Sequence, residues 1–217
     1  MPQNVLVIAP HPDDEAIGCG GTICLHIERG DRTQAVFLTS GERGIPGASR
    51  ESAWAVREGE AREAAKVLRL DGMAFLRLPD FALSEWIESG AKQLQEVLQS
   101  WRPSIIYLPH PEDGHPDHQA ALPMVHGALA HHPSQALPEL RLYEVWSPMT
   151  RFGWAEDIST FMPQKLRAVQ CYHSQLQRFR YDRAVQGLNR YRGCLAARCR
   201  YAEVYRSVSA ELSRSTE

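Results

Sequence analysis

Two short segments, far apart in the chain, carry most of the residues whose types and spacing could do chemistry. The first is HPDDE at residues 11–15, and the second is GHPDH at residues 114–118. Three successive acids repel one another, so a simple turn has no need of them. Imidazole and carboxylate groups are common zinc ligands and also act as general acids and bases. Both segments therefore raise the question of a metal centre.

In the first segment, the spacing separates two acidic roles. His11 and Asp14 are three residues apart in a turn that Pro12 stiffens, so an imidazole and a carboxylate can point to one place. Asp13 then points elsewhere and can stand beside a metal ion without binding it. Two neighbouring carboxylates in different environments suit two different tasks.

The second segment adds imidazoles at the start of a predicted helix. His115 and His118 are spaced i,i+3, so both side chains can face the same side. A catalytic zinc site keeps three protein ligands and leaves a position for water, and His11, Asp14 and His118 would supply such a set. His115 is then left as an imidazole that does not bind the metal.

These parts together predict metal-assisted hydrolysis. A bound metal lowers the pKa of its water from about 15.7 toward about 7 and polarises a carbonyl group. Asp13 would take the proton from that water. His115, as an imidazolium oriented by the nearby Asp117, would stabilise the oxyanion or protonate the departing amine.

Each segment alone has a simpler explanation, because acids at a helix start interact favourably with the helix dipole. It is the combination of the two segments that favours a metal site. Several other histidines are expected at the surface or packed in the core, namely His26, His126, His131 and His132. His110 is expected to support the second segment, and His173 is left open between packing and the site.

The alternation of strands and helices predicts where these segments lie. Strands are expected at 4–8, 33–39, 73–78, 104–108 and 140–146, and helices at 16–29, 50–69, 90–101 and 116–131. Beyond residue 150 we expect a strand-like piece at 157–162, helical runs at 163–179 and 181–197, and an edge strand at 200–208. The pattern predicts an α/β fold, a Rossmann-like and mostly parallel sheet with helices on both faces and a C-terminal extension.

Such a sheet would bring the two segments together. Ligands of open parallel sheets bind beyond the carboxyl ends of the strands. HPDDE follows the first predicted strand, SGERG the second, PD the third and PHPEDGHPDH the fourth. The sequence therefore places its polar and metal-binding residues along one rim.

The composition and charge of the chain argue against nucleic-acid-binding and membrane-spanning proteins. The 217 residues fit one domain, 1–217, with a flexible polar tail at 209–217. A formal net charge of -2 gives no basic footprint for nucleic acid, and no apolar run reaches the ~18 residues of a membrane span. The five cysteines form no C-x-x-C pair, and the start shows no signal peptide, so we expect reduced thiols and a cytoplasmic location. The oligomeric state stays open, a homo-oligomer included.

The motifs also carry a family resemblance. APHPDDE together with DGHPDH resembles the zinc-dependent deacetylases of the PIG-L/LmbE family, which remove acetyl groups from N-acetylglucosaminyl substrates. Further similar stretches are LTSGERG, VREGEAREAAKVL, LPD, HSQ at 173–175 and YAEVY at 201–205, so the resemblance covers nearly the whole chain. LTSGERGIPG leans toward the bacillithiol-pathway branch.

The resemblance implies roles for individual residues. His11, Asp14 and His118 would bind zinc, with iron(II) as the other metal that such ligands can hold. Asp13 would be the general base, and His115 the electrostatic partner oriented by Asp117. Two further residues would contact the substrate, an N-acetylated amino sugar of small size: Arg57, at its sugar or substituent, and Asp80, near sugar hydroxyls. The alternative for Arg57 is an i,i+3 contact with Glu60 on the helix surface.

One position departs from part of the family. The mycothiol branch carries a tyrosine two residues before the first histidine of the second motif, and this chain has Asp113 there. If that tyrosine helps to hold the oxyanion, another group must do so in this chain.

Other readings of the sequence stay in competition. GCGGT at 18–22 could suggest a dinucleotide site, but G-x-G-x-x-G is missing, and glycines that permit close helix packing are favoured. Besides N-deacetylation, an amidase of a thiol-sugar conjugate, a deacylase of longer acyl chains and a non-catalytic sugar binder are alternatives. Four tryptophans could stack on a sugar if they lie over the rim: Trp54, Trp86, Trp146 and Trp154.

Overall fold

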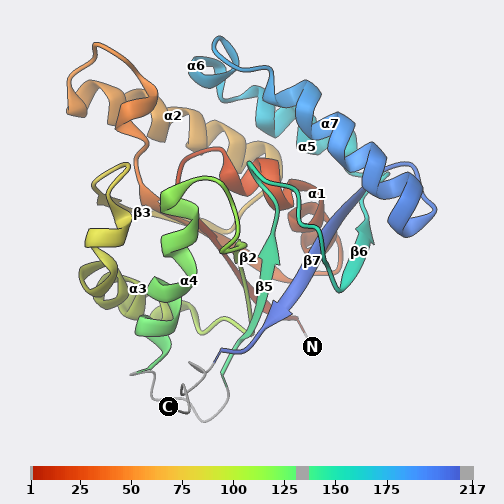
Figure 1. Cartoon of the computed structure of the whole chain (residues 1–217), viewed down its shortest axis with the longest axis horizontal. Helices are drawn as coiled ribbons and strands as arrows, with labels where there is room; N and C mark the ends of the chain where they lie inside the picture. The colour runs from red at the N-terminus through yellow and green to blue at the C-terminus, as the bar shows by residue number, and fades with distance from the viewer. Residues whose placement is uncertain (1, 131–136, 211–217) are drawn as a thin grey trace.

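A mostly parallel sheet forms the centre of the computed structural model, which describes residues 2–130 and 137–210 (Figure 1). Within these residues, seven strands lie in the order β3-β2-β1-β4-β5-β7-β6. The strands are β1 (Asn4–Ala9), β2 (Arg32–Thr39), β3 (Gly72–Leu78), β4 (Ile105–Pro109), β5 (Glu139–Tyr143), β6 (Trp154–Asp157) and β7 (Ala202–Val208). Strands β1 to β5 pair in parallel, and β7 is antiparallel to both β5 and β6. The expected fold class is confirmed.

Helices cover both faces of this sheet. The helices are α1 (Asp14–Glu28), α2 (Arg50–Leu68), α3 (Ile87–Trp101), α4 (Pro116–Leu129), α5 (Met162–Gln170), α6 (His173–Leu176) and α7 (Tyr181–Arg192), with short turns η1 (Glu42–Gly44), η2 (Leu83–Glu85) and η3 (Gly193–Ala197). Helices α1, α2 and α5 pack on one face, and α3 and α4 pack on the other. None of the described helices is both long and apolar enough to cross a membrane.

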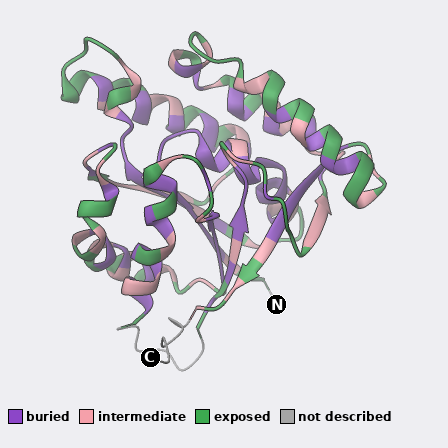
Figure 2. Cartoon of the chain, viewed as in Figure 1, coloured by how far each residue is buried: buried purple, intermediate pink, exposed green. Residues whose placement is uncertain are grey.

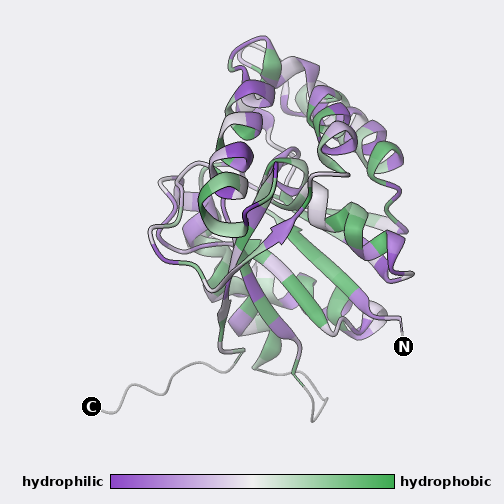
Figure 3. Ribbon diagram, turned by 90° about the vertical axis from the view of Figure 1, so that its right-hand side faces the viewer, coloured by the Kyte–Doolittle hydropathy of each residue, from purple (hydrophilic) through white to green (hydrophobic). Residues whose placement is uncertain are grey.

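Strand β1 shows why the sheet is buried on both sides. Val5 and Val7 join the core beneath α1 and α2, whereas Leu6 and Ile8 join the core beneath α3 and α4. All four side chains are fully buried, and the sheet is buried throughout its centre (Figure 2). Alternate side chains of a strand point to opposite faces, so a strand between two helical layers needs a continuous apolar run. Figure 3 shows these apolar strands beneath helices with polar outer faces.

The C-terminal third differs from expectation in three places. The strand expected at 157–162 is wrong, because β6 ends at Asp157 and α5 begins at Met162, where Pro163 suits a first helical turn. The helix expected at 163–179 is broken after α5, where Tyr172 turns inward. The strand expected at the edge is β7, which lies between β5 and β6, so β6 is the edge strand. Of the expected tail, residues 211–217 lie outside the described chain.

The glycines of GCGGT allow α1 to approach its neighbours closely. A Cβ atom on Gly18 would lie 2.2 Å from the Tyr143 ring, and one on Gly21 would lie 2.6 Å from Ile158 Cβ. Helix α1 is kinked at Cys19, and the Glu203 carboxylate accepts hydrogen bonds from Gly21 N (2.9 Å) and Thr22 N (2.8 Å). These glycines therefore serve packing and the kink.

This packing gives a stability prediction. We expect Gly21→Ala to lower the free energy of unfolding by about 1–3 kcal/mol, because its new methyl group would overlap Ile158. Gly59→Ala in α2 is the matched control, since no atom lies within 4 Å of its Cβ position; it should raise stability by about 0.5–1 kcal/mol. Urea unfolding of both variants measures the difference, and equal effects would contradict the packing role.

Candidate metal centre

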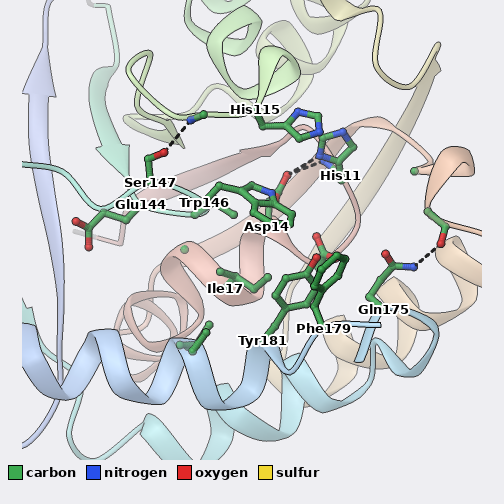
Figure 4. Close-up of a pocket in the computed structure, with 18 of the residues that line it drawn as sticks. His11, Asp14, Ile17, His115, Glu144, Trp146, Ser147, Gln175, Phe179 and Tyr181 are labelled. Atoms are coloured by element: carbon green, nitrogen blue, oxygen red, sulfur yellow. Dashed lines mark hydrogen bonds and ion pairs between the residues drawn. The ribbon is translucent and has the colours of Figure 1, made fainter. Parts of the chain in front are cut away.

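The two motif segments meet at the carboxyl ends of β1 and β4. These strands are neighbours and run parallel, so the turn after β1 and the loop after β4 leave the sheet on the same rim. A cavity of about 970 Å³ opens there. His11, Asp14 and His115 all line it (Figure 4).

One carboxylate oxygen of Asp14 lies close to a ring nitrogen of each of the other two expected ligands. Asp14 Oδ2 lies 3.2 Å from His11 Nδ1 and 3.2 Å from His118 Nε2. It also accepts a hydrogen bond from the His11 backbone N–H at 2.8 Å. Asp14 is 1 % exposed and His118 is 0 % exposed. The structure thus brings His11, Asp14 and His118 together at one buried point.

The outer nitrogen of each of these two imidazoles faces another carboxylate. His11 Nε2 lies 3.1 Å from Asp117 Oδ2 and 3.3 Å from Asp80 Oδ1. His118 Nδ1 lies 3.0 Å from Asp113 Oδ1. Metal-binding histidines characteristically donate their second N–H to such an acceptor, which fixes the tautomer and the ring orientation. The arrangement leaves His11 Nδ1 and His118 Nε2 facing Asp14.

These donors fit a metal ion. His118 Nε2 is buried and has no hydrogen-bond partner within the described chain. One ligand atom from each of His11, His115 and His118 lies within 4.8 Å of the others, so the imidazole nitrogens of His11 and His118 are within reach of a single ion. Two imidazole nitrogens and one carboxylate oxygen are the ligand types that zinc favours. This cluster can therefore bind a metal, and metal dependence is typical of the family that the motifs resemble.

A second cluster shares one histidine with the first. Ligand atoms of His11, Asp80 and Asp117 also lie within 4.8 Å of one another. Asp80 Oδ2 already accepts a hydrogen bond from Arg43 N (2.8 Å), and Asp117 Oδ2 accepts one from Phe81 N (2.7 Å). Because these carboxylates are satisfied by backbone donors, we interpret this group as support for the His11 ring.

Burial and charge set opposite pKa shifts across the centre. Burial alone would lower the pKa of His118, but Asp14 and Asp113 outweigh it and raise that pKa to about 9. Burial also disfavours the charged form of Asp14, yet the two histidines hold the pKa of that carboxyl well below its usual range. The carboxylate at the centre is therefore kept ionised, as a ligand must be.

Asp13 lies beside the centre in an unusual backbone conformation. Its φ angle is 130°, which costs energy for a residue with a side chain and occurs at functional sites. Asp13 Oδ2 lies 3.2 Å from Arg57 Nη2, and Asp13 N donates to Glu15 Oε2 at 3.2 Å. Burial raises the pKa of Asp13 to about 6, although Arg57 opposes the shift. No contact between this carboxylate and an imidazole nitrogen is found in the described chain.

Arg57 lies behind the Asp13 turn rather than on the helix surface. It is 2 % exposed, and its Nη2 donates to Pro12 O as well as to Asp13. The alternative contact with Glu60 is long, at 3.9 Å, and Glu60 instead accepts two hydrogen bonds from Ser174. Arg57 also lines the cavity, so the structure brings it to the site but uses one of its nitrogens to hold Asp13.

Asp117 contacts His115 through its backbone and not through its side chain. The Asp117 carboxylate contacts His11, and only its backbone N–H reaches His115, donating to Nδ1 at 3.2 Å. A ring nitrogen that accepts a hydrogen bond carries no proton, so this contact does not match an imidazolium. Burial, with the neighbouring His11 and His118, lowers the pKa of His115 to about 4. Both observations favour a neutral His115 imidazole with its proton on Nε2 over the expected imidazolium.

Asp113 is the functional residue that the sequence did not reveal. It is 0 % exposed and accepts four hydrogen bonds, from His118 Nδ1 and from the backbone N–H groups of His115, Trp146 and Ser147. The sequence marked this position only as a departure from the tyrosine of another branch. Its i,i+5 spacing from His118 carries no recognisable signal, because the contact depends on how the loop folds.

The remaining histidines lie outside the centre. His26 contacts Asp31 and the Tyr107 hydroxyl, and His110 contacts Ser147 O, which supports the second segment as expected. His173 is exposed and does not line the cavity, whereas Gln175 does. His126 contacts Ser209 O, and the expectations for His131 and His132 fall outside the described residues.

Comparisons with known proteins identify the family of the chain. The family model PIG-L, described as GlcNAc-PI de-N-acetylase, matches residues 6–129. A probable N-acetyl-alpha-D-glucosaminyl L-malate deacetylase 2 from Bacillus anthracis is 30 % identical over 189 residues, which cover 80 % of this chain and 81 % of the relative. A diacetylchitobiose deacetylase from Thermococcus kodakarensis is 30 % identical over 194 residues, covering 80 % and 70 %.

A solved structure extends the similarity to the C-terminal third. A conserved protein from Thermus thermophilus superposes with a TM-score of 0.83 and 31 % identity. The match covers 97 % of this chain and 96 % of that one, so it includes β6, β7 and α7.

The contacts of Asp113 give a prediction about metal affinity. Asp113→Asn replaces a carboxylate oxygen with an NH₂ group that would face N–H donors, so the support of His118 is lost. We expect metal affinity to fall about 10–100-fold. Glu96→Gln is the matched control, because Glu96 is exposed on α3 and does not line the cavity. Competition with a chromophoric chelator measures both, and equal affinities would contradict the role of Asp113.

Proposed function

Because the chain belongs to the PIG-L family of GlcNAc-PI de-N-acetylases, we propose that it hydrolyses the N-acetyl amide of a small N-acetylglucosamine-containing molecule. The observation that carries this proposal is the position of Asp14 Oδ2 between His11 Nδ1 and His118 Nε2, with Asp13 beside it. N-deacetylation is the activity named for both relatives described above, and N-acetylglucosaminyl or diacetylchitobiose units are the substrates in their names.

The proposed cofactor is one zinc ion held by His11, Asp14 and His118. When bound, it would polarise the amide carbonyl and acidify a water molecule. The same ligands also suit iron(II). The two clusters of possible ligand atoms in the described chain share His11, so they do not form two separate metal sites, which supports a single-ion enzyme rather than a two-metal phosphoesterase.

Asp13 is the general base in this proposal. Its Oδ2 would accept the proton of the attacking water and later pass it to the leaving nitrogen. Arg57 holds this carboxylate and the Pro12 carbonyl, so it fixes the direction of the base in a backbone conformation that is otherwise unfavourable. Arg57 is thus a positioning residue, and because it also lines the cavity, a further contact with the substrate is part of the proposal.

His115 is the hydrogen-bond donor to the oxyanion. Its Nδ1 is occupied by Asp117 N, so Nε2–H is available to donate into the cavity that His115 lines. A preorganised neutral donor stabilises developing negative charge without any proton rearrangement. This assigns the oxyanion task to His115 in a chain where Asp113 replaces the tyrosine of the mycothiol branch.

The sugar would lie against the polar part of the cavity wall. Asp80, Arg43 and Gln175 line that part, and Asp80 is 5 % exposed. Each Asp80 oxygen already has one partner, His11 Nε2 or Arg43 N, and its second lone pair can accept from a hydroxyl group of the sugar.

The non-catalytic alternative is disfavoured by the base. A sugar-binding protein gains nothing from holding Asp13 in a strained conformation at a metal centre. An amidase of a thiol-sugar conjugate would use the same centre and differ only in the groups attached to the amide.

Replacing the base separates chemistry from metal binding. Asp13→Asn keeps the side-chain shape but cannot take a proton, so we expect kcat to fall about 10²–10⁴-fold while one metal ion per chain is retained. Acetate release from N-acetylated amino sugars and elemental analysis give the two readouts. Full activity of the variant would remove Asp13 from the mechanism.

Removing a ligand should instead remove the metal. His118→Ala deletes one of three ligands, and we expect metal content to fall below about a tenth of an equivalent with activity lost. Chelation of the wild-type protein should abolish acetate release, and added zinc should restore it. Unchanged metal occupancy in His118→Ala would contradict the ligand assignment.

A further inference from the structure

The cavity continues well beyond the metal centre. Its volume of about 970 Å³ lies at the upper end of the roughly 300–1,000 Å³ range of ligand sites, more than one amino sugar needs. The polar wall described above lies on the side of η1 and α6. On the other side, the cavity runs between α1 and α7 towards β7 (Figure 4).

One face of α7 lines this extension from Tyr181 to Asn189. The lining residues of this helix are Tyr181, Ala184, Val185, Leu188 and Asn189. Their spacing of i, i+3, i+4, i+7 and i+8 is that of a single helical face. The eight steps from Tyr181 to Asn189, at 1.5 Å each, make this face about 12 Å long.

Helix α1 continues the same wall from the metal centre. Asp14, Ile17 and Gly18 all line the cavity, and their i, i+3 and i+4 spacing places Ile17 and Gly18 one turn beyond the ligand Asp14. The part of the cavity wall that lies next to the metal centre in this direction is therefore apolar. Figure 4 shows Ile17 between Asp14 and α7.

The charged residues at this end of the cavity are already paired. Glu144 binds Arg192, and Glu203 accepts from Lys165 Nζ at 2.6 Å. Both acids are more than nine-tenths buried. The cavity surface that remains available to a ligand at this end is mainly the apolar surface of α1 and α7.

Aromatic rings form the rim between the centre and this extension. Trp146 and Phe179 are each 49 % exposed, and their ring centroids are 6.1 Å apart. Tyr181 lies 5.7 Å from both rings, and Trp146 stacks at 6.4 Å on His115. Of the tryptophans considered in the sequence, Trp146 is the one that lines the cavity; Trp54 donates to Glu42 and Trp154 packs on Tyr205.

We propose that this extension, lined by Ile17, Ala184, Val185 and Leu188 and named here the acyl arm, binds the acyl chain of the substrate and admits chains longer than acetyl. The inference rests on the proposed function. An N-acyl amino sugar has its sugar on the nitrogen of the amide and its acyl chain on the carbonyl carbon. With the sugar on the polar wall and the amide at the metal centre, the acyl chain points towards α7.

The reaction itself is unchanged by chain length. Water adds to the carbonyl carbon, and the C–N bond breaks. The nitrogen leaves with a proton as the free amine of the sugar, and the acyl group leaves as a carboxylate. Apolar burial contributes about 0.8 kcal/mol per methylene, which corresponds to roughly fourfold in affinity for each one fully buried.

A series of substrates tests the acyl arm on the metal-loaded protein. We expect kcat/KM for N-butyryl- and N-hexanoylglucosamine to equal or exceed that for N-acetylglucosamine, with KM falling along the series. Octyl N-acetylglucosaminide, which carries an alkyl chain on the sugar side instead, should show no such gain. A steep loss of kcat/KM from acetyl to butyryl, or a gain for the octyl glycoside alone, would overturn the inference.

Matched variants of α7 test whether the preference for longer acyl chains arises in the acyl arm. Ala184 is exposed to the cavity, so Ala184→Trp fills the arm without disturbing the core, and the hexanoyl-to-acetyl ratio of kcat/KM should fall at least ~10-fold. Gln186→Trp adds the same ring at an exposed position outside the cavity lining and should leave the ratio unchanged. An unchanged ratio in Ala184→Trp would contradict the inference. Failure of all amides, acetyl included, would instead contradict the proposed function.

Discussion

The site depends on one oxygen atom, Asp14 Oδ2, that stands between imidazole nitrogens from two distant segments. Asp14 and His11 belong to the turn after β1, and His118 belongs to the first turn of α4, more than a hundred residues later. Only a parallel pairing of β1 with β4 brings these turns to the same rim. The proposed chemistry therefore depends on the parallel sheet. The sheet depends in turn on the apolar residues of β1, which are buried on both faces.

Charge balance explains why this geometry calls for a cation. Asp13, Asp14, Asp80, Asp113 and Asp117 are all at least nine-tenths buried around His11, His118 and the Arg57 guanidinium. Buried carboxylates are tolerated only where they are paired or hydrogen-bonded. Asp80, Asp113, Asp117 and Asp14 each accept at least one backbone N–H group, and Asp14 also faces the two histidines. A divalent ion at Asp14 would replace the protons that the metal-free histidines need and would complete the balance.

The sequence predicts much of this arrangement for identifiable reasons. Strand ends follow from the length of apolar runs, and the grouping of His11, Asp14 and His118 follows from local spacing plus the parallel sheet. The partners of Asp117 and Asp113 do not follow, since they depend on the path of loops, and the same holds for Tyr172, which breaks the expected long helix to reach Glu15. The place of β7 inside the sheet also escapes local patterns, because only β6 pairing with it decides which strand is at the edge.

The most direct test of the central claim is the position of the bound metal in a zinc-loaded crystal, located by anomalous scattering. The account predicts one ion at about 2.0–2.2 Å from His11 Nδ1, Asp14 Oδ2 and His118 Nε2, with a position left open towards the cavity. An ion bound instead by His11 Nε2, Asp80 and Asp117 would contradict it, because the carboxylates assigned to support would then be the ligands.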